Sequence, residues 1–313
     1  MKRYGIGILR QAVTALLIIG LVPTGTALAA ESLTEISANV YAYVDTRNMS
    51  AQNSFGANAG IIIGRDGILV VDTLISSREA QRFLKDIRLI TDKPIRYVVN
   101  THYHLDHAFG NADFAREGAV VISQLKDAAN LKTHGQAALG NAKEYGLTEQ
   151  DMEGTEIVLP ALAFGDRLDI DLGDRTVQLI YTGVSHTEGS ILVYLPESKI
   201  LFAGDILFTG YHPYLGEGNI EEWVKVLDRI AAMDADKIIP GHGPVSTKKD
   251  VRDMKEYLIA FDKKARELTA TSQDAGQVAA EMGKILPPKA EGEGLIRMSI
   301  EQKYLPQPAV PAK

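Results

Sequence analysis

The feature that most constrains this chain is a run of four potential metal ligands within six residues, His102-x-His104-x-Asp106-His107. The run directly follows Ile95–Asn100, an apolar stretch that predicts a short buried strand. His102 and His104 are two residues apart, so in extended backbone their side chains point to the same side. Asp106–Arg116 is predicted as a helix. The four side chains therefore have to crowd together where a strand ends and a helix begins.

Such crowding favours a metal site over a hydrogen-bonded surface loop. Several imidazoles at one point are poorly satisfied without a cation, whereas an ion holds them as neutral ligands. The chain has no cysteine, which excludes disulfides, thiolate ligands and a cysteine nucleophile. Histidine and carboxylate ligands favour zinc or a similar borderline ion, with iron or manganese as alternatives.

Three more ligand-type residues each follow a predicted strand. His186 comes after the strand of residues 177–181, Asp205 after residues 200–203, and His242 after residues 237–240. Strand ends that meet at one edge of a sheet form a rigid cup for a site. We therefore expect these three side chains to join the His-rich run.

Predicted strands fall into two groups, each followed by helices, and no linker separates the groups. The strands of residues 36–73 include the hairpin turn Arg65-Asp66-Gly67, and amphipathic helices are predicted over Ser76–Ile90, Asn219–Met233 and Val251–Thr271. The simplest layering is an α/β (α+β) domain over residues 30–285 with two sheets inside and helices outside. Residues 286–313 are predicted to be a C-terminal extension, partly disordered.

Residues 1–29 have the layout of a cleaved signal peptide. Lys2, Arg3 and Arg10 precede and flank the apolar run Ala12–Val22, and Ala27-Leu28-Ala29 provides small residues for cleavage. The apolar run is shorter than the roughly 20 residues that span a bilayer. We expect a periplasmic or secreted protein with no stable membrane insertion after cleavage; an uncleaved anchor is the alternative.

The expected mature chain is acidic. Removing residues 1–29 leaves 30 Lys and Arg against 40 Asp and Glu, a net charge of −10. Such a chain has no overall attraction to nucleic acid phosphates. The expected partner is a small-molecule substrate, and the sequence leaves the oligomeric state open.

The ordered set of His-rich run, His186, Asp205 and His242 resembles the metallo-β-lactamase superfamily of hydrolases over about residues 36–250. The resemblance implies a four-layer αββα sandwich of two mixed β-sheets flanked by helices, with the metals at one edge. It also implies ligand roles. His102, His104 and His186 would hold one metal, Asp106, His107 and His242 a second, and Asp205 would bridge both.

The same resemblance implies a mechanism in which a hydroxide between two cations attacks the substrate. Asp106 would be the catalytic residue that orients the hydroxide or passes its proton to the leaving group. Asp72 would support a ligand without binding metal itself. Tyr211, His212 and Tyr214, in the loop after Asp205, are candidate substrate contacts, whereas His134 is predicted to lie at the surface and Trp223 in the core.

Differences between this chain and known subfamilies of the superfamily limit the reactions that it can be expected to catalyse. β-Lactamases of the superfamily generally have Cys or Ser at the position of Asp205, whereas an Asp is typical of thioesterases and lactonases. The glutathione thioesterases of the superfamily have basic residues after the bridging Asp, whereas residues 206–212 of this chain contain no Arg or Lys. The flavin-partnered di-iron branch has Glu at the position of His104, so His104 argues against that branch. The leading hypothesis is a dinuclear zinc hydrolase of an ester, thioester, lactone or amide. The alternatives are a class-B-like β-lactamase, a mononuclear iron sulfur dioxygenase and non-enzymatic metal-dependent binding.

Overall fold

The structure is a computed structural model that describes residues 33–44 and 49–306. All of these residues belong to one compact unit, Glu31–Lys313. The predicted signal peptide and the last seven residues of the predicted extension lie outside the described part of the chain. No helix within the described ranges combines the length and the apolarity that a bilayer crossing requires.

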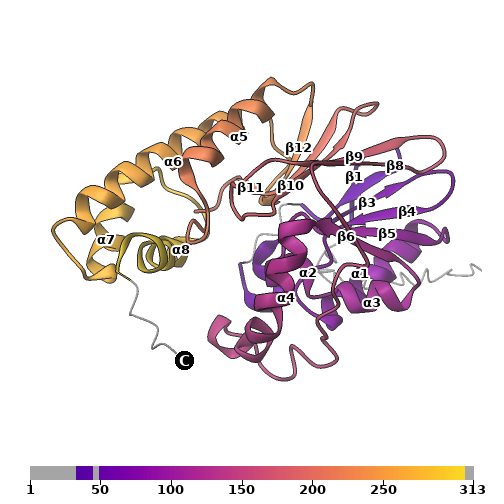
Figure 1. Cartoon of the computed structure of the whole chain (residues 1–313), viewed down its shortest axis with the longest axis horizontal. Helices are drawn as coiled ribbons and strands as arrows, with labels where there is room; N and C mark the ends of the chain where they lie inside the picture. Colours follow the sequence, from indigo (N-terminus) through magenta and orange to yellow (C-terminus); the bar gives the residue numbers. More distant parts are fainter. Residues whose placement is uncertain (1–32, 45–48, 307–313) are drawn as a thin grey trace, which may run out of the picture. The chain divides into compact units, whose positions relative to one another are not determined.

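Two mixed β-sheets form the centre of this unit (Figure 1). The first sheet follows chain order, with antiparallel pairing from β1 to β4 and parallel pairing from β4 to β7. Its strands are β1 (Thr34–Ser37), β2 (Val40–Ala42), β3 (Gly60–Ile63), β4 (Ile68–Val71), β5 (Ile95–Val99), β6 (Val120–Gln124) and β7 (Leu162–Phe164).

The second sheet has the order β12-β11-β10-β9-β8. Its pairs are antiparallel except for β11 and β12, which run parallel. Its strands are β8 (Arg167–Asp171), β9 (Thr176–Tyr181), β10 (Ile191–Leu195), β11 (Ile200–Phe208) and β12 (Lys237–His242).

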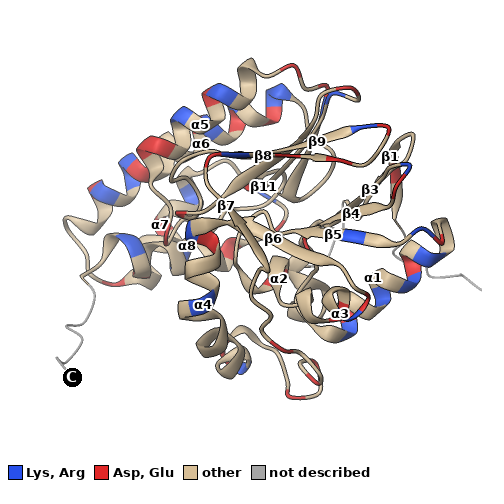
Figure 2. Cartoon of the chain, turned by 45° about the vertical axis from the view of Figure 1, so that its right-hand side comes forward, with Lys and Arg blue, Asp and Glu red and all other residues tan. Residues whose placement is uncertain are grey.

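Helices cover the outer face of each sheet (Figure 1). Phe83 of α1 and Phe114 of α3 pack with Ile61 and Val70 of the first sheet, and Trp223 of α5 packs with the second sheet. The helices are α1 (Ser77–Ile90), α2 (Leu105–Ala108), α3 (Asn111–Arg116), α4 (Leu125–Gly140), α5 (Ile220–Ala232), α6 (Lys248–Thr269), α7 (Ala275–Ile285) and α8 (Glu293–Ser299), with short 3-10 turns at Ala51–Gly56 and Ala142–Tyr145. Lys, Arg, Asp and Glu gather along the outer helices, while the strands are largely free of charge (Figure 2).

The two sheets pack face to face through a common apolar layer. Val71 and Val99 of the first sheet and Val193 and Phe202 of the second are all buried in one cluster. Together with the outer helices, this gives the four-layer αββα arrangement expected from the sequence. The predicted fold class is confirmed.

The helix predicted for Asp106–Arg116 is wrong as a single helix. Helix α2 ends at Ala108 and α3 begins at Asn111, with Phe109 and Gly110 between them. The backbone N–H of Gly110 donates to the carbonyl of Leu74, and a Cβ at Gly110 would lie 2.1 Å from the carbonyl oxygen of Thr73. This close approach to another segment interrupts the helix, and helical periodicity does not reveal it.

The segment that follows α6 continues as ordered structure. Helix α8 leads into a π-helical turn at Ile300–Tyr304. Ile296 and Ile300 are buried in the same cluster as Trp223 of α5 and Phe261 of α6. Residues 293–304 are therefore packed on the helical layer outside the second sheet.

Candidate metal centre

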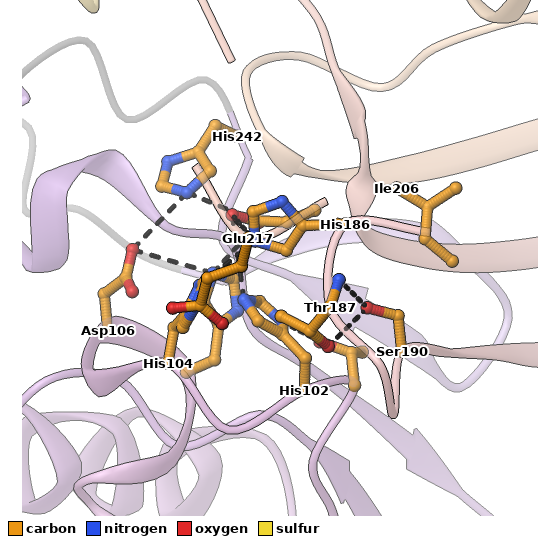
Figure 3. Close-up of polar contacts among 12 residues, drawn as sticks. His102, His104, Asp106, His186, Thr187, Ser190, Ile206, Glu217 and His242 are labelled. Carbon is orange, nitrogen blue, oxygen red and sulfur yellow. Dashed lines mark hydrogen bonds and ion pairs between the residues drawn. The ribbon is translucent and has the colours of Figure 1, made fainter. Parts of the chain in front are cut away.

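The structure brings all seven predicted ligand residues to one edge of the two sheets (Figure 3). His102 and His104 follow β5, and Asp106 and His107 lie in α2. The other three come from the second sheet: His186 from the loop between β9 and β10, Asp205 from β11, and His242 from the end of β12.

The sequence predicted that Asp205 follows the strand of residues 200–203. In the structure Asp205 instead lies within strand β11. Strand β11 continues to Phe208 through two irregularities in its pairing with β12, one on each side of Gly204. Gly204 has φ +49, and a Cβ there would lie 2.6 Å from Oγ1 of Thr101. The kink at Gly204 thus allows a strand residue to face the His-rich run.

The seven side chains form two groups, in each of which the potential ligand atoms lie within 4.8 Å of one another. One group is His102, His104, His186 and Asp205, and the other is Asp106, His107 and His242. This division is the one that the resemblance implied. Six of the seven residues are buried, and His104 is half-buried.

The carboxylate of Asp205 faces both groups. Its Oδ2 lies 3.4 Å from Nε2 of His186 and 3.7 Å from Nε2 of His102. Its Oδ1 lies 3.1 Å from Nε2 of His107 and 3.4 Å from Nε2 of His242. One carboxylate thus presents one oxygen to each group, which is the arrangement required of a bridging ligand.

Several buried polar atoms at this point have no hydrogen-bond partner among the described residues. They are Nε2 of His102, Nε2 of His107 and Oδ1 of Asp205. Leaving such atoms buried and unpaired costs free energy, so native proteins supply a partner. Because these atoms are nitrogen and carboxylate oxygen facing a common space, a divalent cation fits as that partner.

The outer nitrogens of these histidines are held by protein groups. Nδ1 of His107 lies 2.9 Å from Oδ2 of Asp72, and Nδ1 of His102 lies 3.1 Å from Oγ1 of Thr101. Asp72 also accepts from the backbone N–H and the hydroxyl of Thr101. Nδ1 of His242 donates to the carbonyl of Phe55 at 3.1 Å. These contacts orient the rings so that their Nε2 atoms face the common space.

Glu217 is a contact that sequence reasoning missed. Its Oε1 lies 3.3 Å from Nε2 of His104 (Figure 3). Its Oε2 accepts from the hydroxyl of Tyr103 at 2.6 Å. His104 therefore turns its Nδ1 inward, where it lies 3.0 Å from Nε2 of His186. Glu217 lies in the loop before α5, and no spacing pattern in the sequence connects it with His104, 113 positions earlier.

Burial keeps His102 and His186 neutral. It lowers the pKa of His186 to about 3 and holds the pKa of His102 well below its usual value. Burial raises the pKa of Asp205, but the neighbouring His242 and His107 outweigh it and hold this pKa well below its usual value. Burial also lowers the pKa of His107 and His242, but the carboxylates of Asp205 and Asp106 outweigh it, so that the pKa of His107 lies well above its usual value and that of His242 rises to about 9. A metal bound here would displace these protons, because histidine binds metal as the neutral imidazole.

A cavity of about 460 Å³ opens onto the site, with His104, Asp106, Asp205 and His242 in its lining. Tyr214, one of the three candidate substrate contacts, also lines it. His212 is instead buried, with its Nδ1 2.6 Å from the hydroxyl of Tyr257, and the buried ring of Tyr211 lies 5.6 Å from that of His242.

The remaining two residues lie where the sequence placed them. His134 is exposed on α4. Trp223 is fully buried, and its indole donates to the carbonyl of Ile206 at 2.9 Å.

Two packed sheets with a histidine and carboxylate cluster at their common edge define a class of metal-binding αββα proteins. The chain belongs to the metallo-beta-lactamase superfamily, whose family model matches residues 53–242, more than half of the chain. The expected family is therefore confirmed, and with it membership of a superfamily of metal-dependent hydrolases.

Relatives with different activities match this chain at similar levels. A linear primary-alkylsulfatase of Pseudomonas is 26% identical over 222 residues, which are 60% of this chain and 42% of that protein. This chain thus spans less than half the length of that relative. A metallo-beta-lactamase type 2 of Bacteroides fragilis is 26% identical over 235 residues, covering 74% of this chain and 86% of that protein.

Solved structures agree on the fold. A metallo-beta-lactamase from Pontibacter korlensis superposes with a TM-score of 0.59 at 20% identity, covering 73% of this chain and 98% of the other. At this level of identity the likeness concerns the fold, and the reaction has to be argued from the site.

Proposed function

We propose that this chain is a dinuclear zinc hydrolase that cleaves an ester, thioester, lactone or amide bond. The observation that carries the proposal is the orientation of Asp205, whose two carboxylate oxygens face separate groups of ligand-type side chains. A site for one metal needs no carboxylate shared in this way. His102, His104 and His186 would hold one ion, and Asp106, His107 and His242 the other.

Two divalent cations at this position would supply a hydroxide nucleophile near neutral pH and polarise the substrate carbonyl. The protein's own residues set up the rest. Asp106 lines the cavity, and its Oδ2 lies 3.4 Å from Nε2 of His242 and 3.6 Å from Nε2 of His107. From that position its carboxylate can orient the nucleophile and carry a proton to the leaving group.

A β-lactamase is the second candidate. The support for it is the match to the Bacteroides fragilis metallo-beta-lactamase, which covers 86% of that protein. Against it stands Asp205, because β-lactamases of the superfamily generally have Cys or Ser there. We therefore rank lactam hydrolysis below hydrolysis of esters, thioesters and lactones.

The test combines metal analysis with a substrate panel on one sample of purified protein. We expect two zinc ions per chain and turnover of at least one ester, thioester, lactone or alkyl sulfate; the sulfate is included because of the alkylsulfatase relative. A chelator should abolish turnover, and added zinc should restore it. One iron per chain with oxygen uptake would favour a sulfur dioxygenase, and a filled site without turnover would favour metal-dependent binding.

We also propose that the chain is exported, because residues 1–29 have the layout of a signal peptide. The expected product is a periplasmic or secreted chain that begins at Ala30. Mass spectrometry of the protein recovered from cell fractions tests this, and a cytoplasmic chain that retains residues 1–29 would contradict it.

A further inference from the structure

The cavity beside the metal centre has a wall that lies outside the family-matched region. Leu295 and Met298 of α8 line the cavity, together with Gly292, Glu293 and Gln302 from the same segment. The family match ends at residue 242. The non-reacting part of a substrate bound at the metals therefore meets a surface that is particular to this chain's C-terminal segment.

This wall is fixed directly to the loop that follows the Asp205 strand. The backbone N–H of His212 donates to the carbonyl of Glu291 at 2.9 Å, and that of Leu215 donates to Oγ of Ser299 at 2.9 Å. Ile296 and Ile300 anchor the other side of the segment in the core. Because one face is bonded to the site loop and the other is buried, Leu295 and Met298 are held in place.

The wall and its surroundings are apolar. Besides Leu295 and Met298, the lining includes Met49, Phe55, Leu105 and Phe208. An apolar lining around a small set of polar groups is typical of small-molecule sites, and 460 Å³ lies within their usual range of roughly 300–1,000 Å³. The free energy of binding here comes from burial of apolar substrate surface.

The charged side chains of the lining that lie outside the two ligand groups all carry the same sign. They are Glu144, Glu217 and Glu293, and the lining among the described residues contains no Lys or Arg. Glu144 and Glu293 line the cavity and are exposed, so they stand where the cavity meets solvent. Negative charge around an opening repels anionic ligands and attracts cationic ones.

We infer that the non-reacting part of the substrate is an apolar group without negative charge, held against Leu295 and Met298 of α8. This inference rests on the proposed hydrolase function and adds the substrate class to it. It also gives the C-terminal segment a role in substrate selection. A compound whose far end carries a carboxylate, sulfate or phosphate is selected against at the entry by Glu144 and Glu293.

The test uses three aryl esters with the same six-carbon acyl chain, whose far ends are methyl, carboxylate and trimethylammonium. At low salt we expect kcat/KM for the carboxylate ester to be about 10-fold below that for the methyl ester, with the gap narrowing as salt is raised. The double variant Glu144→Lys with Glu293→Lys should remove or reverse this gap. Leu295→Asn should lower kcat/KM about 10-fold for the six-carbon methyl ester and far less for an acetate ester, which has less apolar surface to bury.

Two controls accompany these variants. Arg297→Gln changes an exposed α8 side chain that pairs with Glu301 and does not line the cavity, and it should leave all three esters unchanged. Arg47 lies outside the described residues, so Arg47→Ala is assayed as well. A preference of the parent chain for the carboxylate ester would overturn the inference. Arg47→Ala would then show whether the Arg47 side chain causes that preference.

A second readout does not depend on turnover. Calorimetry on the metal-loaded chain measures binding of trifluoromethyl ketones with the same three far ends, and the carboxylate compound should bind about 10-fold more weakly than the methyl compound. If no ester, thioester, lactone or amide is hydrolysed although two metals are bound, the proposed function fails, and calorimetry still decides the inference. If the esters are hydrolysed without regard to charge or to Leu295, the inference fails and the proposed function stands.

Discussion

The floor and the C-terminal wall of the cavity are built in different ways. The floor consists of seven ligand-type side chains between residues 102 and 242, inside the family-matched region, and nearly all of them are buried. Four of its histidines are oriented by contacts with Asp72, Thr101, Glu217 and the Phe55 carbonyl. The wall, from residue 292 to 302, lies beyond that region and is held by apolar packing and a few backbone contacts.

This difference indicates which substitutions should affect the chemistry and which should affect the choice of substrate. A floor of buried polar atoms that face a common space tolerates little change, because removing one candidate ligand leaves the others unsatisfied. A wall of half-buried apolar side chains tolerates exchange of one side chain for another and changes mainly what it binds. The chemistry should therefore depend on the floor and the choice of substrate on the wall.

The largest effect is expected at the shared carboxylate. Asp205→Ala removes the one side chain that faces both groups, so at least one metal should be lost per chain. Activity should fall by at least about 1000-fold, beyond the roughly 10- to 100-fold cost of losing an outer contact. Metal content and kcat/KM measured on the same sample check this. His134→Ala, which removes an exposed imidazole on α4, is the control, and two retained metals in Asp205→Ala would refute the bridging role.

A smaller effect is expected at Glu217. Glu217→Gln keeps the shape of the side chain but weakens its contact with Nε2 of His104, so metal affinity should fall about 10- to 100-fold. Competition with a chromophoric chelator measures this affinity. Glu144→Gln, a change of the same type at an exposed carboxylate lining the same cavity, should leave the affinity unchanged. Equal losses in both variants would show that net charge, and not orientation of His104, sets the affinity.

The attachment of the wall can be tested through stability. Ile300→Ala would open a cavity beneath the π-helical turn, and we expect it to lower the free energy of unfolding by about 2–5 kcal/mol. Urea denaturation with and without bound metal measures the change. The exposed Ile285→Ala is the matched control and should cost far less. If Ile300→Ala left the free energy of unfolding unchanged, the wall would not be anchored in the core through Ile300, and the proposed difference between floor and wall would be wrong.

The smallest effect is expected at the start of α5. The side chain of Asn219 accepts from the backbone N–H of Glu222, and the backbone N–H of Asn219 donates to the carbonyl of Ser185 at 2.9 Å, beside His186. Asn219→Ala should lower the free energy of unfolding by about 1 kcal/mol and raise the metal dissociation constant only slightly. Asn219→Asp should restore the cap, and thermal denaturation compares the three proteins. A loss of several kcal/mol would mean that this loop does more than begin a helix.

The sequence was informative about the floor and much less so about the wall. Local spacing places His102 and His104 side by side, and strand ends predict where His186 and His242 meet them. The beginnings of α1 and α5 were also predicted, at Ser76 and Asn219, and in the structure both side chains cap their helices. In each case a short-range pattern contains the information.

What the sequence did not reveal depends on contacts between distant segments. Asp205 was expected beyond its strand, but the kink at Gly204 places it within β11. Gly110 divides a predicted helix because its backbone meets Thr73 and Leu74 of another segment. Glu217 and the α8 wall reach the cavity through packing of separate helices, and no periodicity in the chain connects those residues.

The supply of candidate ligands from both sheets has a consequence for how the protein would acquire its metals. Two members of each group come from the His-rich run that follows β5 of the first sheet, and the others come from the second sheet, so neither candidate ion pocket is complete until the two sheets have packed together. Ions that bind only the finished fold stabilise it by mass action and are selected at the end of folding. Since ligands of this kind accept several divalent metals, the supply in the compartment where folding is completed decides which metal the chain keeps.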